Sequence, residues 1–347
     1  MEITRTDNWN TSLEMAGTFY SYQAFDLRLV SDEPLPGLRV GEPGLSDLQV
    51  YFRGKVPKLT GQKSIRRDVP EVPGLAYETI FGADAMQIRM LHESGSIRLV
   101  LTGTTIAFEW SRGIDIRTVK ALFCGMILKS TALWRGKFAL HAGAVEISGG
   151  KAFVVAGQKG AGKSTLLAGL YAAGARLVAE DMAVLSRSGG GWHVHSGARI
   201  LKLVAQTATA LGLDDGATLE AGEWHSDHSA TAALLRSQKV LLDTTARDGA
   251  QGPKSLPLAA VYLLGSRSGD DSVLERLGKP QAVALLAREL SAVPEMLEPR
   301  EDKKAAVQNV LALVQDVPIY RLRLPNDLSH VQAVARRLMQ GVVAEAG

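Results

Sequence analysis

Residues 157 to 165 read Gly-Gln-Lys-Gly-Ala-Gly-Lys-Ser-Thr, the spacing of a phosphate-binding loop (Walker A). A short apolar stretch at 153–156 precedes the loop as a predicted strand, and residues 166–173 follow as a predicted helix that ends at Gly174. Glycines let backbone N–H groups surround phosphate oxygens, and the amino end of the helix adds partial positive charge. This stretch therefore predicts an α/β fold with a nucleoside triphosphate site.

The loop residues have separate expected roles. Lys163 is expected to reach the β- and γ-phosphates, and the Ser164 hydroxyl to bind Mg²⁺. ATP is the expected nucleotide, although no residue pattern indicates a nucleobase and pyrophosphate is an alternative donor. The candidate nucleotide-binding residues are Gly157, Gln158, Lys159, Gly160, Ala161, Gly162, Lys163, Ser164 and Thr165.

Length and composition narrow the class of protein. The chain has 347 residues, enough for two domains, and its 46% hydrophobic content is that of an ordinary globular protein. A net charge of +3 is too small to indicate a nucleic-acid partner. The first residues lack the form of a signal peptide, and the longest apolar run, 256–264, is too short to span a bilayer. These features predict a cytoplasmic protein without a membrane partner.

The pattern of elements predicts a strand-rich amino-terminal domain, 1–135, ahead of a nucleotide-binding domain, 136–347. Alternating segments fill the first 110 residues and include a hairpin that turns at Thr102-Gly103. A helix is expected from Asp115 to about Trp134, with Cys124 packed in its apolar face. Further elements are expected as a strand at 256–264, helices near 279–291 and 302–314, a strand at 317–324 and a final helix from Asp327.

Three polar segments stand apart from the predicted helices and strands, and two of them are open to more than one interpretation. Residues 53–67 carry several cations and no acidic residue, which indicates a solvated surface loop or a docking surface for an acidic peptide. Residues 214–236 and 243–255 are expected to be polar, mobile segments. The first of these holds possible metal ligands without any standard spacing, so a polar loop is favoured there: Glu223, His225, Asp227 and His228.

Titratable residues are predicted to converge at the mouth of the loop. Residues 140–147 and 152–156 read as a hairpin, and a turn centred on Gly149-Gly150 would place His141 opposite Gln158. Residues 175–179 read as a strand parallel to the loop's own strand, which brings Glu180 and Asp181 to the same edge. These carboxylates and the imidazole then lie where a γ-phosphate is expected.

Two roles are open for the carboxylates. Asp181 or Glu180 could bind the metal or accept the proton of an acceptor hydroxyl, and the sequence does not decide between these roles for Asp181. His141 could orient the carboxylate, contact the γ-phosphate or serve the fold alone. The sequence lacks an Asn-Lys-x-Asp segment and a Leu-Ser-Gly-Gly-Gln segment, which disfavours GTPases and transporter-type ATPases.

Residues 140–145, the loop and 174–181 together resemble the catalytic core of HPr kinase/phosphorylase. The resemblance is specific over about residues 137–185 and weaker to about 213. It implies a fold related to phosphoenolpyruvate carboxykinase, with ATP and Mg²⁺ as cofactors. It also implies that Asp181 is the base that activates a serine hydroxyl, that His141 is its neighbour, and that the protein is a homo-oligomer, since the related enzymes are hexamers.

The chain departs from that family's pattern at three places, one of them the amino-terminal region, which looks unlike that of the long regulatory enzymes. Glu180 stands where the family has the first aspartate of a pair, a change that keeps the charge. The family's later Glu-Ile-Arg-Gly is echoed only by Ala198-Arg199-Ile-Leu, which keeps an arginine for stabilising developing charge but lacks a glutamate that could bind magnesium. The sequence therefore gives no ground for assuming the reverse phosphorylase reaction and does not decide whether it occurs.

The layout of the amino-terminal region looks more like that of the shorter HPr-kinase-like proteins of peptide-modification gene clusters. Members of that group phosphorylate a serine at the end of a lasso-peptide precursor. The resemblance thus implies an ATP-dependent serine kinase acting on a peptide or small protein. Two alternatives stay open: an HPr(Ser) kinase in carbon regulation, and a nucleotide-gated module that binds a peptide without modifying it.

The expected catalytic residues are Asp181, His141, Lys163, Glu180 and Arg199, and the expected metal ligands are Ser164 and Asp181.

Overall fold

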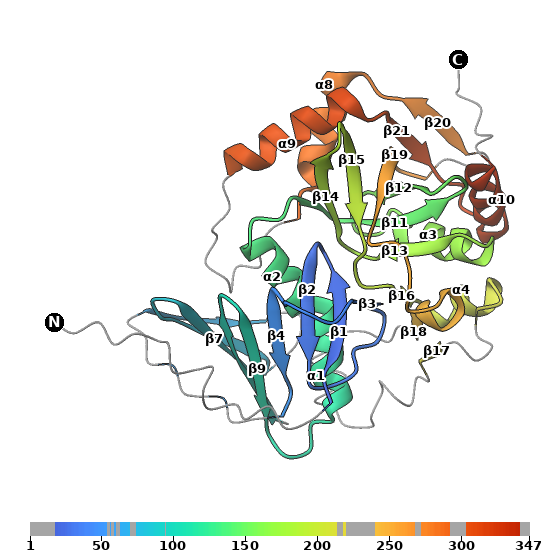
Figure 1. The fold of residues 1–347 in the computed structure, drawn as a ribbon. Coiled ribbons are helices and arrows are strands. Elements are labelled where there is room, and N and C mark those ends of the chain that lie inside the picture. Colours follow the sequence, from blue (N-terminus) through green and yellow to red (C-terminus); the bar gives the residue numbers. More distant parts are fainter. Residues whose placement is uncertain are drawn as a thin grey trace.

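A computed structural model describes residues 18–53, 56, 59, 63–69, 74–93, 95–213, 218–219, 240–267, 272–291 and 303–340. Within these ranges the fold is mixed α/β, with two nine-stranded sheets and one three-stranded sheet. Figure 1 shows the first large sheet below and to the left of the second. None of the described helices is long and apolar enough to cross a bilayer.

The first sheet takes up the strand-rich start of the chain, in the order β3-β1-β2-β4-β9-β8-β7-β6-β5. The predicted hairpin at Thr102-Gly103 is confirmed, because β8 and β9 pair antiparallel across it. Part of the basic segment 53–67 forms the edge strand β5 rather than a loop, with mostly exposed side chains. The strands are β1 (Tyr20–Ala24), β2 (Leu27–Ser31), β3 (Arg39–Val40), β4 (Leu48–Tyr51), β5 (Lys63–Asp68), β6 (Ala76–Phe81), β7 (Ala85–His92), β8 (Gly95–Thr102) and β9 (Thr105–Trp110).

A helical segment follows, made of α1 (Ile116–Leu122), the π-helical turn η1 (Phe123–Ile127) and α2 (Leu128–Trp134). The Asp115 carboxylate caps it by accepting a hydrogen bond from the Arg117 N–H at 2.7 Å, so the predicted start is confirmed. Its apolar face packs on the first sheet, where Phe123 meets Phe52 and Phe108 edge to face. Cys124 is buried in the same core, as expected, and burial raises the pKa of its thiol to about 12.

The second sheet has the main order β10-β14-β15-β19-β12-β11-β13, and β21 joins β19 and β20 at one side. Strands β12, β19 and β21 are parallel, and β11 lies antiparallel between β12 and β13. The expected strand at 256–264 is confirmed as β19. The strands are β10 (Ala139–Leu140), β11 (Ala142–Ile147), β12 (Lys151–Ala156), β13 (Arg176–Ala179), β14 (Ala183–Ser188), β15 (Gly191–His195), β19 (Ser255–Leu264), β20 (Val273–Arg276) and β21 (Ile319–Arg323).

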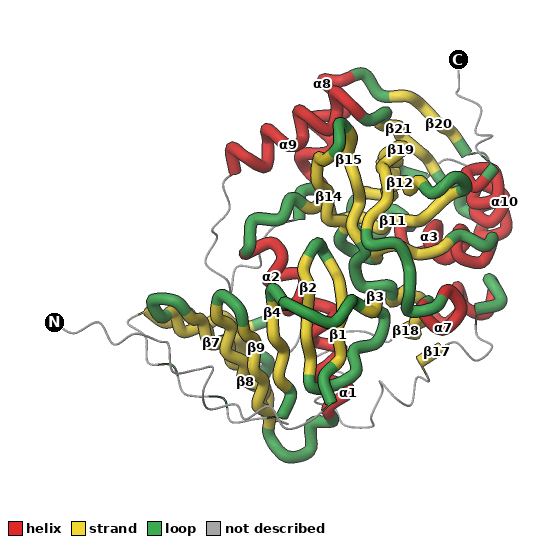
Figure 2. The backbone as a smooth tube through the Cα atoms, in the orientation of Figure 1, coloured by secondary structure: helices red, strands yellow, loops and turns green. Residues whose placement is uncertain are grey.

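Helices cover both faces of this sheet, whose central strands β12 and β19 are largely apolar. On β12, Val154 packs with residues of α8 and α9, whereas Phe153 and Val155 pack with residues of α3 and α10. Figure 2 shows these two pairs of helices on opposite sides of the strands. Four of the expected helices are thereby confirmed: α3 (Lys163–Ala172), α8 (Lys279–Leu286) with its 3-10 extension η2 (Ala287–Glu289), α9 (Lys303–Asp316) and α10 (Leu328–Met339).

A small third sheet, in the order β16-β18-β17, lies beside α3. It consists of β16 (Ile200–Leu203), β17 (Thr218–Leu219) and β18 (Val240–Asp243), with α4 (Ala205–Ala210) and α7 (Thr245–Asp248) nearby. Part of the segment 243–255, which was expected to be polar and mobile, forms α7. There Arg247 stacks on the Tyr171 ring at 3.4 Å and donates to the carbonyls of Tyr171 and Ala175. Glu223, His225, Asp227 and His228 lie outside the described residues.

The hairpin before the loop differs from its prediction by one residue. Ala142 pairs with Ala156 and Ile147 with Lys151, so His141 comes opposite Gly157 rather than Gln158. The physical reason is a three-residue turn, 148–150, in which both glycines have positive φ, +82° and +69°. A two-residue turn would have given the expected register.

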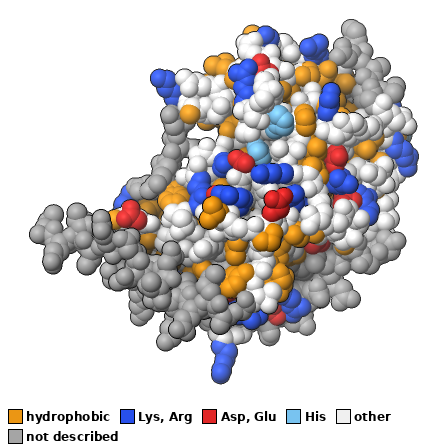
Figure 3. Space-filling model, in the orientation of Figure 1, with side chains coloured by type: hydrophobic (Ala, Val, Ile, Leu, Met, Phe, Trp, Pro, Cys, Tyr) orange, Lys and Arg blue, Asp and Glu red, His pale blue; other side chains and the backbone are white. Residues whose placement is uncertain are grey.

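The two large sheets meet at the turn between β1 and β2. Phe25 and Asp26 both have positive φ there, and the Phe25 N–H donates to the Ser196 carbonyl at 2.7 Å. Lys137 pairs with Asp26 at 2.7 Å, and Gly197 faces the Phe25 ring. Figure 3 shows basic, acidic and histidine side chains together across the middle of this face, between the two sheets.

Gly197→Ala is expected to weaken this junction. A Cβ at Gly197 would come within 2.5 Å of the Phe25 ring and 2.9 Å of the Ala179 Cβ, so the free energy of unfolding should fall. Overpacking of this kind costs about 1–3 kcal/mol. The matched control is Gly191→Ala in β15, where no atom lies within 4 Å of the added Cβ. Urea unfolding measures both variants, and equal stability of the two would show that this contact does not constrain the fold.

Candidate functional site

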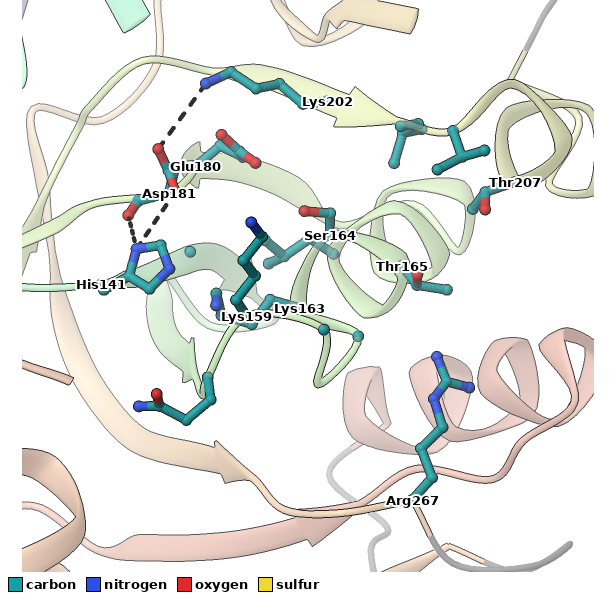
Figure 4. A pocket seen from close by; sticks show the side chains of 17 residues that line it. His141, Lys159, Lys163, Ser164, Thr165, Glu180, Asp181, Lys202, Thr207 and Arg267 are labelled. Carbon is teal, nitrogen blue, oxygen red and sulfur yellow. Dashed lines mark hydrogen bonds and ion pairs between the residues drawn. The ribbon is translucent and has the colours of Figure 1, made fainter. Parts of the chain in front are cut away.

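A cavity of about 510 Å³ opens at the carboxyl end of β12. Its lining comes from the loop after β12, the residues that follow β13, and β16 with the start of α4. Figure 4 shows His141 and Asp181 pointing toward one another at one end of the cavity, and Arg267 approaching from the opposite end. Five of the expected catalytic and metal-binding residues line it together: His141, Lys163, Ser164, Glu180 and Asp181.

The loop between β12 and α3 requires glycine at three positions. Gly157, Gly160 and Gly162 all have positive φ, and a Cβ on Gly157 would lie 2.9 Å from the Leu264 Cβ. The Lys163 ammonium donates to the Gly157 carbonyl and so lies across the loop. Because the first N–H groups of a helix have no partner within the helix, the start of α3 presents donors to an anion at this place.

Asp181 sits at a strained backbone position just beyond β13. Its φ is +66°, and the Met182 N–H donates to the Glu180 carbonyl at 2.8 Å, which closes a three-residue γ-turn around Asp181. Such conformations cost roughly 1–3 kcal/mol and gather at functional sites. In Figure 4 the Asp181 side chain points toward His141, whereas the Glu180 side chain points away from it.

Cations surround the Asp181 carboxylate. Lys129 Nζ lies 2.5 Å and Lys202 Nζ 3.9 Å from its Oδ2, and His141 Nδ1 lies 3.4 Å from its Oδ1. Burial alone would raise the pKa of this carboxyl, but the charges of Lys129 and Lys202 outweigh burial and hold the pKa well below its usual value. Asp181 is therefore ionised at neutral pH.

Lys129 and Lys202 were not predicted from the sequence. Lys129 is on the buried face of α2 and is only 8% exposed, and burial, together with the charge of Lys202, lowers the pKa of its ammonium. The sequence did carry one indication of its role: Lys129 stands in the middle of an apolar helical run, and a buried lysine needs an anion as its partner. Lys202 gave no comparable signal, because a polar residue in an alternating strand such as β16 is ordinary.

His141 links Asp181 to a distant segment. Its main-chain N–H donates to the Glu289 carbonyl at 2.6 Å, and its Nδ1 lies 3.0 Å from the Asp181 carbonyl. Because a carbonyl oxygen only accepts, Nδ1 must carry the hydrogen, which leaves Nε2 as an acceptor in the neutral ring. His141 and Asp181 therefore lie next to each other, as expected. The hairpin register from which this was predicted was wrong by one residue.

The structure does not bring Arg199 to the cavity. Its side chain is 1% exposed and donates to the carbonyls of Gly249 and Ala250, both at 3.2 Å. Arg199 therefore holds the 249–250 turn instead of stabilising charge at the loop. Arg267 lines the cavity instead, near Gly162, with its guanidinium donating to the Pro325 carbonyl at 3.0 Å.

The oxygen donors of the cavity fit a hard cation that also binds phosphate. Ser164, Glu180 and Asp181 supply a hydroxyl and two carboxylates, the ligand types that Mg²⁺ prefers. No group of three or more His, Cys, Asp or Glu residues among those described could hold a metal ion alone. A magnesium ion here would therefore complete its shell with water and phosphate oxygens, as it does in nucleotide sites.

Comparisons with known proteins find similarity among solved structures. No family model matches the sequence, and no curated protein matches it. Among solved structures, the HPr(Ser) kinase/phosphatase from Coxiella burnetii is similar, with 12% sequence identity over 58% of this chain and 93% of that chain, at a TM-score of 0.30. A similarity at this level does not indicate a function, so the function is inferred from the residues of the cavity.

Lys129→Met is expected to raise the pKa of Asp181 toward its ordinary value, because the nearest positive charge is lost. With the low pKa, the charged Asp181 stabilises the fold above its unfolded-state pKa, and this contribution is lost as the pH falls below that value. The variant should therefore show a smaller acid-dependent loss of stability. Carboxyl-carbon NMR titration measures the pKa directly.

The matched control is Lys120→Met on α1, whose ammonium pairs with Glu33 at 3.0 Å and not with Asp181. An unchanged Asp181 titration in Lys129→Met would show that this ion pair does not control the carboxylate.

Proposed function

We propose that this protein is an ATP- and Mg²⁺-dependent kinase that transfers the γ-phosphoryl group to a serine hydroxyl of a peptide or small protein. The observation that carries the proposal is the position of Asp181, an ionised carboxylate at one end of a cavity that the 157–165 loop also lines. A protein that only binds a nucleotide has little use for such a carboxylate next to the terminal phosphate.

The loop side of the cavity would hold the donor. Lys163 and the N–H groups at the start of α3 bind the β- and γ-phosphates, and the Ser164 hydroxyl binds Mg²⁺. We assign the second protein ligand to Glu180 rather than Asp181, because two lysine ammonium groups already face the Asp181 carboxylate. The metal would supply charge neutralisation at the β- and γ-phosphates.

The opposite side would orient the acceptor. As the serine oxygen forms its bond to the γ-phosphorus, the bond from that phosphorus to the β,γ-bridging oxygen breaks and ADP leaves. The serine proton passes to Asp181. A carboxylate with a low pKa is a weak base, so Asp181 chiefly orients the hydroxyl and receives the proton late in the transfer. Lys129 and Lys202 compensate negative charge as the phosphoryl group approaches.

The acceptor class is inferred from the sequence resemblance to HPr-kinase-like proteins. A ribosomally made precursor peptide of the lasso type is the acceptor we propose first, and HPr is the rival acceptor. A homo-oligomeric assembly, hexameric as in the related enzymes, is proposed on the same basis. A cytoplasmic location is also proposed.

Mass spectrometry of candidate acceptors tests the proposal. HPr and a serine-ended precursor peptide are each incubated with the protein, ATP and Mg²⁺, and with the Lys163→Ala variant as control. We expect one phosphate to be gained on the peptide, and none with the variant, because the β/γ-phosphate contact is lost. A gain on HPr alone would assign the rival acceptor. ATP binding without transfer to either would favour the peptide-binding module.

Asp181→Asn is expected to abolish transfer, by roughly 10²-fold or more, because an amide can neither accept the proton nor balance the flanking lysines. Nucleotide affinity should stay within a few-fold of the unmodified protein, since the loop contacts remain. Asp68→Asn on the exposed edge strand β5 is the matched control and should leave both quantities unchanged. Transfer at a normal rate by Asp181→Asn would disprove the assignment of Asp181.

A further inference from the structure

Arg267 lies at the end of the cavity that the proposed transfer step does not use. It follows β19, and Figure 4 shows Arg267 and Thr165 toward the end opposite Asp181. Both residues line the cavity. The acceptor hydroxyl and the γ-phosphate belong to the Asp181 end in the proposed reaction, which leaves Arg267 without a function.

Two main-chain carbonyls hold the Arg267 guanidinium in place. Arg267 is exposed, and an exposed arginine side chain is ordinarily free to take many rotamers. Its Nη1 nonetheless donates to the Pro325 carbonyl at 3.0 Å and to the Asn326 carbonyl at 3.2 Å, in the segment between β21 and α10. These two bonds orient the guanidinium before any ligand binds, which lowers the entropy cost of binding an anion there.

The other donors of this guanidinium lie beside the loop. Nη1 carries two of its five N–H donors, and Nε and Nη2 carry the other three. Within the part of the chain that the structure describes, these three donate to no acceptor, and Arg267 forms no ion pair with a carboxylate. Nη2 is 3.3 Å from the point that a Cβ on Gly162 would occupy. This arrangement fits a phosphate group, which arginine binds through paired hydrogen bonds.

The order of the groups along the cavity indicates which phosphate this is. In a loop of this spacing the main-chain N–H groups hold the α- and β-phosphates, and Lys163 reaches the β- and γ-phosphates. The γ-phosphate faces Asp181 in the proposed reaction. Because the three phosphates form an unbranched chain, the α-phosphate lies toward the opposite end, where Thr165 and Arg267 line the cavity.

We propose that Arg267 binds the α-phosphate of the donor through its Nε and Nη2 groups. This inference rests on the proposed kinase function and adds the class of donor: a chain of at least three phosphates, as in a nucleoside triphosphate. Pyrophosphate fills only the β- and γ-positions and makes no contact with Arg267. The cavity therefore selects a nucleoside triphosphate over pyrophosphate, the alternative donor that the sequence left open.

Calorimetric titration with three ligands in the presence of Mg²⁺ tests the contact. ATP, inorganic tripolyphosphate and pyrophosphate are each titrated into the unmodified protein and into Arg267→Met, which keeps an unbranched side chain without the donors. We expect the Kd to rise about 10- to 100-fold for ATP and for tripolyphosphate, because charge-assisted hydrogen bonds to the third phosphate are lost. The Kd for pyrophosphate should stay within a few-fold of its original value.

Each other result overturns the proposal and identifies what Arg267 does instead. A loss of affinity for ATP but not for tripolyphosphate would place Arg267 on the nucleoside. An equal loss for all three ligands would place it on the β- or γ-phosphate. Unchanged affinity for all three would show that Arg267 does not bind the donor.

Arg276→Met is the matched control. Arg276 is exposed at the end of β20 and does not line the cavity, so its loss removes the same charge without removing a contact. All three affinities should be unchanged in this variant. A loss as large as that in Arg267→Met would attribute the effect to net charge and overturn the proposed contact.

Transfer kinetics separate this inference from the proposed function. On the acceptor identified by mass spectrometry, Arg267→Met should raise KM for ATP about tenfold or more and leave kcat nearly unchanged, because the α-phosphate contact is the same in the ground state and the transition state. A fall in kcat with an unchanged KM would refute the inference and leave the kinase function intact. ATP binding without transfer to any acceptor would contradict the kinase function, and the three affinities would still decide the role of Arg267.

Discussion

The ion pair between Lys129 and Asp181 is the contact on which the arrangement of the site depends. Lys129 comes from a helix that packs on the first sheet, and Asp181 follows a strand of the second sheet, so the pair connects the two halves at the edge of the loop. Desolvating a lysine and holding an aspartate at a φ of +66° both cost stability. Packing of the helix on its sheet offsets these costs. A role in function explains the presence of the Lys129–Asp181 ion pair better than a contribution to stability does.

Sequence patterns predicted the structure correctly wherever a local rule determines it. The spacing of the 157–165 loop and the run of residues before Asp181 led to the correct edge of the sheet, because strand directions fix where those ends lie. The register of the hairpin was missed by one residue, since a two-residue and a three-residue turn both suit Gly149-Gly150. Arg199 was misassigned because its neighbours in sequence say nothing about the 249–250 carbonyls that it binds.

The residues that sequence analysis missed all come together through long-range contacts. Lys129, Lys202 and Glu289 belong to segments far apart in the chain, and no periodicity relates them. Lys129 alone carried a signal, as a lysine in an apolar helical face. Glu289 gave none, because its contacts with Gln158 and His141 join segments that are far apart in the sequence. Burial and charge in the folded chain, rather than spacing, define this part of the site.

In the proposed reaction the phosphates bind the 157–165 loop, and the acceptor hydroxyl lies at the His141–Asp181 end of the cavity. A crystal structure with a non-hydrolysable ATP analogue and Mg²⁺ tests this central claim most directly. We predict the β- and γ-phosphates on the amides at the start of α3, with the γ-phosphorus facing Asp181. A triphosphate bound away from the loop, or one whose γ-phosphate points toward Arg267 and away from Asp181, would contradict it.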